Sequence, residues 1–119
     1  MPLRGFEDIT KNISEEEVEM AERIAKNINQ KCVGKQNAVS NKRLRDAILD
    51  KDGVVIGGPR IRKMINYIRA MNLVPRLCAN SKGYFRAAND QEWDDWKESM
   101  QQRINEQQNI LDAGIYYNG

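Results

Sequence analysis

Apolar residues recur at intervals of three and four positions in four stretches of the sequence, which is the spacing of amphipathic helices. The predicted helices cover residues 15–30, 41–49, 59–71 and 90–112. Between the last two, residues 73–79 and 84–87 form short apolar runs on either side of the turn sequence Asn-Ser-Lys-Gly, which predicts a β-hairpin. We therefore expect a mainly α protein (α+β) with one small hairpin and a long C-terminal helix.

Residues that cap helices stand at each predicted start. Ser14 with Glu17 three positions later forms a capping-box pattern, and Ser40 and Asn89 precede the second and fourth helices. Gly58 suits the N-cap of the third helix, followed by a proline at its first position, where a missing N–H costs nothing.

The third helix has two unlike faces. Its apolar stripe consists of Ile61, Met64, Ile65, Ile68 and Met71, and its opposite side carries Arg62, Lys63, Asn66, Arg69 and Ala70. Exposed helix faces are usually solvated and mix charges of both signs, because acidic and basic side chains four positions apart stabilise each other. This helix contains no acidic residue, so its polar face suits an anion.

The charge is unevenly distributed along the 119 residues, which form one domain with a net charge of only +2. Residues 31–88 carry 13 basic and 3 acidic side chains, whereas residues 1–30 carry 4 and 7 and residues 89–119 carry 2 and 7. A basic region of this kind is typical of proteins that bind a polyanion. Lys42 and Arg43 also stand in the first turn of the second helix, where unpaired N–H groups favour a phosphate.

The residue types argue against an enzyme or a metalloprotein. The chain has no histidine, which is the commonest general base at neutral pH and a common metal ligand, and the two residues Cys32 and Cys78 are expected to be free thiols. We expect no cofactor. No apolar run approaches the roughly 18 residues that a transmembrane helix needs, and no signal peptide is evident, so we expect a soluble, cytoplasmic protein.

Residues 36–88 resemble a known family. The basic helix from Gly58 to Arg69 and the sequence Ser81-Lys82-Gly83-Tyr84-Phe85 after a short spacer resemble the recognition helix and wing of winged helix-turn-helix domains of the biotin-operon-repressor type. Small phage and bacterial DNA-binding proteins are similar. The resemblance implies that the helix over residues 59–71 enters the major groove and that the wing over residues 77–87 contacts phosphate or the minor groove.

We therefore predict sequence-specific binding of double-stranded DNA by a small transcriptional or replication regulator of phage or bacterial origin, without a small-molecule effector. Arginine pairs with guanine and asparagine with adenine. The base-reading candidates are Arg62, Lys63, Asn66 and Arg69, and the DNA-backbone candidates are Ser40, Lys42, Arg43, Arg60, Lys82 and Arg86. The alternatives are a protein-interaction module for phage assembly or replication and, less favoured without an exposed aromatic platform, RNA binding.

The apolar stripe of the last helix predicts that the protein forms a homodimer. Trp93 and Trp96 are expected to cover the domain's own core, and the same stripe continues as Met100, Ile104, Gln107 and Leu111. Pairing with a second copy would bury this seam; the alternative is that the helix folds back along its own domain. The predicted organisation is an arm over residues 1–13, a winged-helix domain over 14–88, the C-terminal helix over 89–112 and a frayed tail over 113–119.

Overall fold

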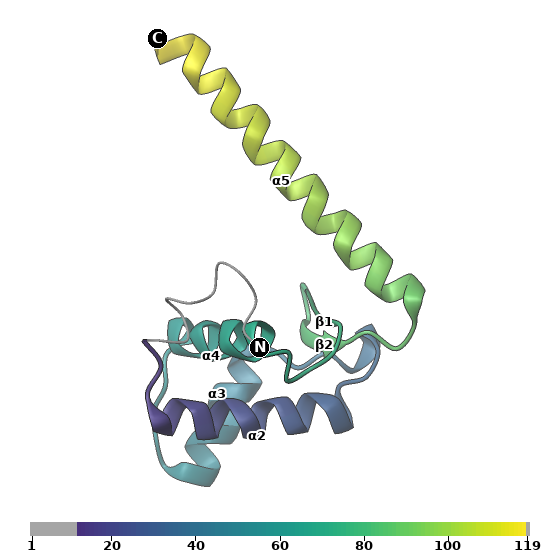
Figure 1. Cartoon of the computed structure of the whole chain (residues 1–119). Coiled ribbons are helices and arrows are strands. Elements are labelled where there is room, and N and C mark those ends of the chain that lie inside the picture. Colours follow the sequence, from purple (N-terminus) through teal and green to yellow (C-terminus); the bar gives the residue numbers. More distant parts are fainter. Residues whose placement is uncertain (1–11, 119) are drawn as a thin grey trace.

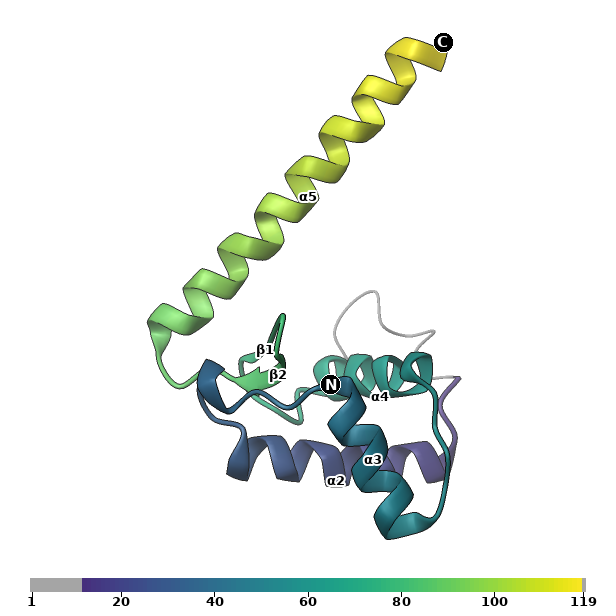
Figure 2. The ribbon, with the colours of Figure 1, turned by 180° about the vertical axis from the view of Figure 1, so that it is seen from behind.

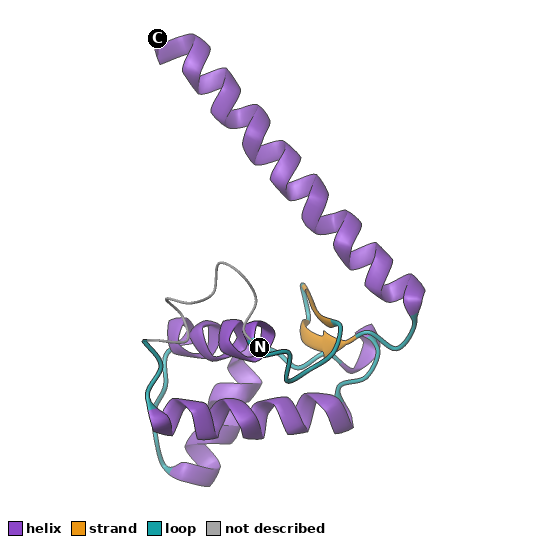
Figure 3. Cartoon of the chain, in the orientation of Figure 1, coloured by secondary structure: helices purple, strands orange, loops and turns teal. Residues whose placement is uncertain are grey.

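The chain is mainly helical with one antiparallel hairpin, so the predicted α+β class is confirmed (Figures 1 and 3). A computed structural model describes residues 12–118, and the predicted arm lies outside them except for its last two residues. The elements are α2 (Glu15–Lys31), the 3-10 helix η1 (Lys35–Asn37), α3 (Asn41–Asp52), α4 (Gly58–Ala70), β1 (Leu77–Asn80), β2 (Gly83–Arg86) and α5 (Asp90–Asn118).

Three of the predicted helix starts are confirmed by their hydrogen bonds. The Ser14 hydroxyl accepts a hydrogen bond from the N–H of Glu17, and the Glu17 carboxylate accepts one from the N–H of Ser14, each at 3.1 Å. The side chains of Ser40 and Asn89 accept from the N–H groups three positions later, at 3.1 and 2.9 Å. Each cap satisfies N–H groups that would otherwise be unpaired at a helix start.

The predicted end of α3 is wrong. The sequence predicts a helix over residues 41–49, but the helix continues to Asp52 and is capped by Gly53, which has a left-handed φ of 68°. Glycine adopts this conformation without a steric penalty, and so it is the usual residue just past a helix end. The longer helix leaves only residues 53–57 to connect α3 to α4.

Two other boundaries also differ from the prediction. The N-cap of α4 is Gly57 instead of Gly58, which moves the proline to the second helical position. The last helix continues through the predicted frayed tail to Asn118. Its one glycine, Gly114, lowers helix stability by only about 1 kcal/mol and is not followed by a proline that would stop the helix.

The main core lies where α4 packs on α2 and α3. The spacing of its apolar residues places one side of each helix inward, as the sequence predicts. Complete burial of a large aliphatic side chain contributes roughly 1.5–3 kcal/mol. The largest fully buried side chains are Ile28, Ile61, Met64, Ile68, Val74 and Cys78.

The hairpin is joined to the connection between α2 and α3. In β1 and β2, Leu77 lies opposite Arg86 and Asn80 lies opposite Gly83. At the other edge of β2, Val39 exchanges two backbone hydrogen bonds with Tyr84, of 2.9 and 2.8 Å. This isolated bridge fixes the hairpin against the start of α3.

Helix α5 projects away from the rest of the molecule (Figures 1 and 2). Its first turns pack on the hairpin, where Trp93 and Trp96 stack on each other at 5.2 Å. They pack against Cys78 and Phe85 of the hairpin and not against the main core between the first three helices. Residues 101–113 are all exposed. The radius of gyration of 16.2 Å exceeds the roughly 13.5 Å of a compact chain of this length, because α5 does not fold back along its own domain.

Candidate nucleic-acid interface

The polar surface of α4 has an exposed middle part and two flanks. Arg62 and Asn66, four positions apart, are both exposed in the middle part, and we call this pair the outer row. Ala70, which was expected on the same face, is fully buried. The other predicted base-reading side chains, Lys63 and Arg69, are half-buried and bond to other elements of the chain.

Glu17 of α2 occupies the first flank. Its carboxylate is buried, with 5% of the residue exposed, and pairs with Lys63 Nζ at 3.1 Å and Arg60 Nε at 3.4 Å. Although α4 itself contains no acid, an acid of α2 therefore neutralises part of its charge. We call Arg60 and Lys63 the flank row.

The Glu17 carboxylate stays ionised at neutral pH. Burial on its own raises the pKa of a carboxyl group, but the N–H and hydroxyl of Ser14 and the ammonium of Lys63 outweigh it and lower the pKa of Glu17 to about 2. The negative charge is thus permanent under ordinary conditions, and it holds both members of the flank row.

Arg69 occupies the opposite flank and joins three elements. Its guanidinium donates a hydrogen bond to the carbonyl of Leu77 in β1 and lies 4.9 Å from the ring centre of Trp96 in α5. Burial lowers the pKa of the guanidinium. The carbonyl and the aromatic face compensate for this partial burial, so Arg69 links α4 to the hairpin and to the base of α5.

Apart from Arg60, which belongs to the flank row of α4, the predicted backbone-binding residues are divided between the start of α3 and the hairpin. Lys42 and Arg43 are exposed in the first turn of α3, although Lys42 also pairs with Asp46 at 3.3 Å. Lys82 is exposed in the hairpin turn. Arg86 is half-buried and reaches toward Asn29 of α2, with 3.5 Å between its nitrogen and the amide oxygen. Its side chain is therefore directed toward α2, at the end of the hairpin away from the turn.

The start of α3 contacts both the hairpin turn and the start of α4. A depression of about 290 Å³ is lined by Ser40 and Asn41 from α3 and by residues 79–84. The Asn41 amide also donates to the carbonyl of Gly58 at 3.3 Å. The start of α3 thus meets both the first residue of α4 and the hairpin turn, which sequence spacing alone does not require. Arg43 lines a separate depression, with Lys31 and Cys32 at the end of α2.

Two residues that contact α4, Glu17 and Asn41, could not be predicted to do so from the sequence. Glu17 is recognisable as part of a capping box, but its pairing with the flank row depends on how α2 packs on α4. Asn41 is recognisable as the first residue of α3, and its bond to α4 depends on the α3–α4 packing. A polar residue next to a helix cap is too common a feature to indicate such a contact.

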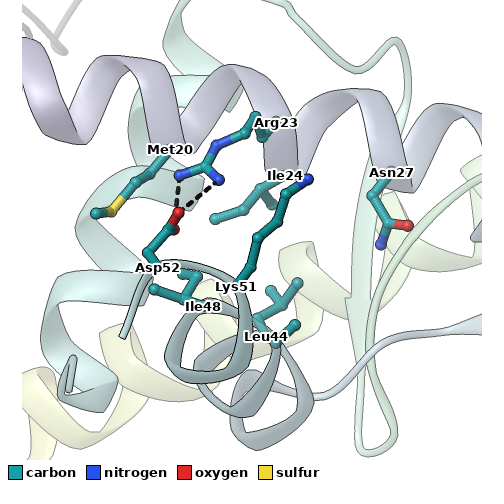
Figure 4. Close-up of a pocket in the computed structure, with 9 residues that line it drawn as sticks. Met20, Arg23, Ile24, Asn27, Leu44, Ile48, Lys51 and Asp52 are labelled. Carbon is teal, nitrogen blue, oxygen red and sulfur yellow. Dashed lines mark hydrogen bonds and ion pairs between the residues drawn. The ribbon is translucent and has the colours of Figure 1, made fainter. Parts of the chain in front are cut away.

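A second depression lies between α2 and α3 (Figure 4). Its volume is about 210 Å³, and an ion pair of 2.7 Å between Arg23 and Asp52 crosses one end of it. The walls are mostly aliphatic, including Met20, Ile24 and Leu44. Its charged side chains are Lys51 and the paired Arg23 and Asp52, and it is formed by other elements than the outer row.

Other chemistry is sparse in the described part of the chain. Cys32 and Cys78 are free, buried thiols, and burial raises the pKa of both, that of Cys78 to about 11. Residues 12–118 contain no cluster of side chains suited to a metal ion. None of the described helices combines the length and apolar character needed to cross a membrane.

No protein-family model, curated protein or solved structure matches the chain. The function is therefore argued from the surface itself.

Proposed function

We propose that the chain binds double-stranded DNA as a winged helix-turn-helix protein, with α4 in the major groove and the hairpin as the wing. The observation that carries this proposal is the exposed outer row of Arg62 and Asn66 on α4. The first residue of this helix, Gly58, accepts a hydrogen bond from Asn41 at the start of α3, and Asn41 lines the same depression as Lys82. These residues belong to the segment of residues 31–88, whose net charge is +10.

The order of the elements supports the winged-helix assignment. Three helices are followed by a hairpin, and the connection before α3 pairs with the hairpin through an isolated bridge at Val39. The connection between α3 and α4, residues 53–57, is shorter than the one between the helices predicted over residues 41–49 and 59–71. Fold alone does not establish function, so the DNA proposal depends on the side chains.

The chemistry of the surface suits the two tasks of a DNA-binding protein. The guanidinium of Arg62 matches the two acceptors of guanine in the major groove, and the amide of Asn66 matches the donor and acceptor of adenine. Lys42, Arg43 and Lys82 lie outside α4, the helix proposed to enter the major groove, and their positive charge suits contacts to phosphate. Such contacts position the protein but do not read the sequence.

A salt titration tests the proposal. If about five phosphates are neutralised, the logarithm of the affinity for random duplex should fall with the logarithm of salt concentration with a slope of roughly −4 to −5. The measurement is fluorescence anisotropy of a labelled duplex between low and moderate salt. The control Lys97→Ala removes a cation from α5, away from the proposed surface, and should leave the slope unchanged. Absence of binding, or binding indifferent to salt, would refute the proposal.

We also propose that two copies pair through α5. Ile104 and Leu111 are 54% and 58% exposed, and with Met100 they continue the stripe that begins at the two tryptophans. The described residues of the domain do not cover this stripe. Apolar strips of this length are unfavourable in water, and a helical partner with the same spacing would bury them.

Sedimentation of the full chain tests this pairing. The parent should be a dimer, and Met100→Glu/Ile104→Glu should be a monomer, with a dimer dissociation constant raised by at least about 100-fold because two carboxylates would be buried unpaired. The matched control Gln102→Glu/Asn105→Glu adds the same charge to the exposed opposite side of α5 and should remain largely dimeric. A monomeric parent, or a dimeric seam variant, would show that this stripe is not the interface.

The exposed stripe also favours one alternative function. A protein-interaction module would use α5 as its working surface, because the helix projects and its later turns have no partner among the described residues. A folded parent that does not bind DNA at low salt would favour this alternative.

A further inference from the structure

Glu17 divides the cations of α4 into two classes. The flank row of Arg60 and Lys63 pairs with its buried carboxylate, whereas Arg62 has no hydrogen bond or ion pair to another side chain within the described residues. The carboxylate is itself held by the N–H of Ser14, at 3.1 Å, so it cannot follow a cation outward without losing its cap.

We propose that Glu17 is a specificity-determining residue: by retaining Arg60 and Lys63 on the α2 side of α4, it leaves Arg62 and Asn66 as the only side chains of α4 that read bases. This inference rests on the proposed DNA-binding function. It narrows the four base-reading residues predicted from the sequence to two, since Arg69 is also retained, by β1 and α5.

Release of the flank row to DNA is unfavourable. If Lys63 turned toward a phosphate or a base, the Glu17 carboxylate would remain buried without its closest cation. A buried charge that loses its partner is strongly destabilising, whereas an exposed lysine gains little from exchanging one anion for another in water. The pair with Glu17 therefore persists when DNA is bound.

The geometry of the outer row defines the kind of site that would be recognised. Arg62 and Asn66 are four positions apart on one helix, which separates them by about 6 Å along its axis. This distance corresponds to about two base steps of DNA. The preferred site should therefore contain a guanine and an adenine within about two base pairs of each other, with little preference set by further α4 contacts.

Substitution of the flank row gives the first test. Duplexes are selected from a random library by the parent protein, by Lys63→Ala and by Arg62→Ala. The duplexes selected by the parent and by Lys63→Ala should share the same guanine preference, and those selected by Arg62→Ala should lack it. Lys63→Ala should bind the selected site within about threefold of the parent, since its ammonium is already neutralised by Glu17. A loss of more than tenfold in Lys63→Ala, or an altered preference, would overturn the inference.

Substitution of Glu17 gives the converse test. In Glu17→Gln the capping-box geometry is kept, because glutamine also accepts the Ser14 N–H, but the charge that holds the flank row is removed. Affinity for random duplex should rise at least threefold over the control Glu16→Gln, and the salt slope should steepen by about 1–2 because up to two more phosphates are contacted. Glu16 is exposed in the same turn, so the control removes an equal charge without releasing the flank row. Equal slopes in the two variants would overturn the inference.

The pairing can be judged without DNA as well. A double-mutant cycle compares the free energy of unfolding in urea of the parent, Glu17→Gln, Lys63→Ala and the double variant. The losses of the two single variants should not add up to the loss of the double variant, which shows that the two side chains interact. If the parent does not bind duplex, the proposed function fails whatever the cycle shows. If the parent binds but the cycle shows no coupling, the role of Glu17 fails and the proposed function stands.

Discussion

Replacing Gly83 with alanine should destabilise the fold by roughly 3–5 kcal/mol, because backbone strain and steric overlap add at this position. Its φ of 137° is one that residues with a side chain rarely adopt. A Cβ atom there would also overlap the backbone carbonyl of Val39, which accepts a hydrogen bond from Tyr84 at 2.8 Å. The substitution should therefore separate the hairpin from the start of α3.

Urea unfolding followed by circular dichroism measures this effect. Gly53→Ala is a matched control, because Gly53 also has a positive φ, of 68°, but has open space where a Cβ would lie. The substitution Gly53→Ala should lower the free energy of unfolding by only about 1–2 kcal/mol. If the two variants lost similar stability, the contact between the hairpin turn and Val39 would not be the structural constraint inferred above.

The double variant Arg62→Ala/Asn66→Ala should lose nearly all discrimination between a selected duplex and random DNA. Each side chain contributes roughly 1–3 kcal/mol through two hydrogen bonds to a base edge, and the pair roughly 2–6 kcal/mol if the contacts add. Both side chains are exposed and neither is part of the core, so the variant should fold normally.

Competition binding against selected and random duplexes distinguishes reading from positioning. The comparison variant Lys82→Ala should weaken binding to both duplexes alike and reduce the salt slope by about 1. If Lys82→Ala changed the sequence preference while the double variant did not, the hairpin rather than α4 would be the reading element.

Local features of the chain could be predicted because they depend on residues close in sequence. The caps at Ser14, Ser40 and Asn89 are where the sequence predicts them, since a cap needs only the next three residues. The predicted stripe of the third helix is buried except for its last residue, Met71, which lies past the end of α4 and is half-buried. The end of α3 was missed because the left-handed cap at Gly53 resembles ordinary turn sequence.

The sequence by itself determined that a basic, single-signed helix would follow two capped helices and precede a hairpin. Only the tertiary structure decided which cations of this helix are paired or enclosed by other elements and which are free to contact a partner. Lys63 and Glu17 are 46 positions apart and meet because α2 packs on α4, and Arg69 is enclosed because β1 and α5 converge on it. Helical spacing shows which side chains share a face, but the partners that neutralise or bury a charge come from elements distant in sequence. The projection of α5 also depends on tertiary structure, because the hairpin contacts only the first turns of this helix and residues 101–113 are exposed.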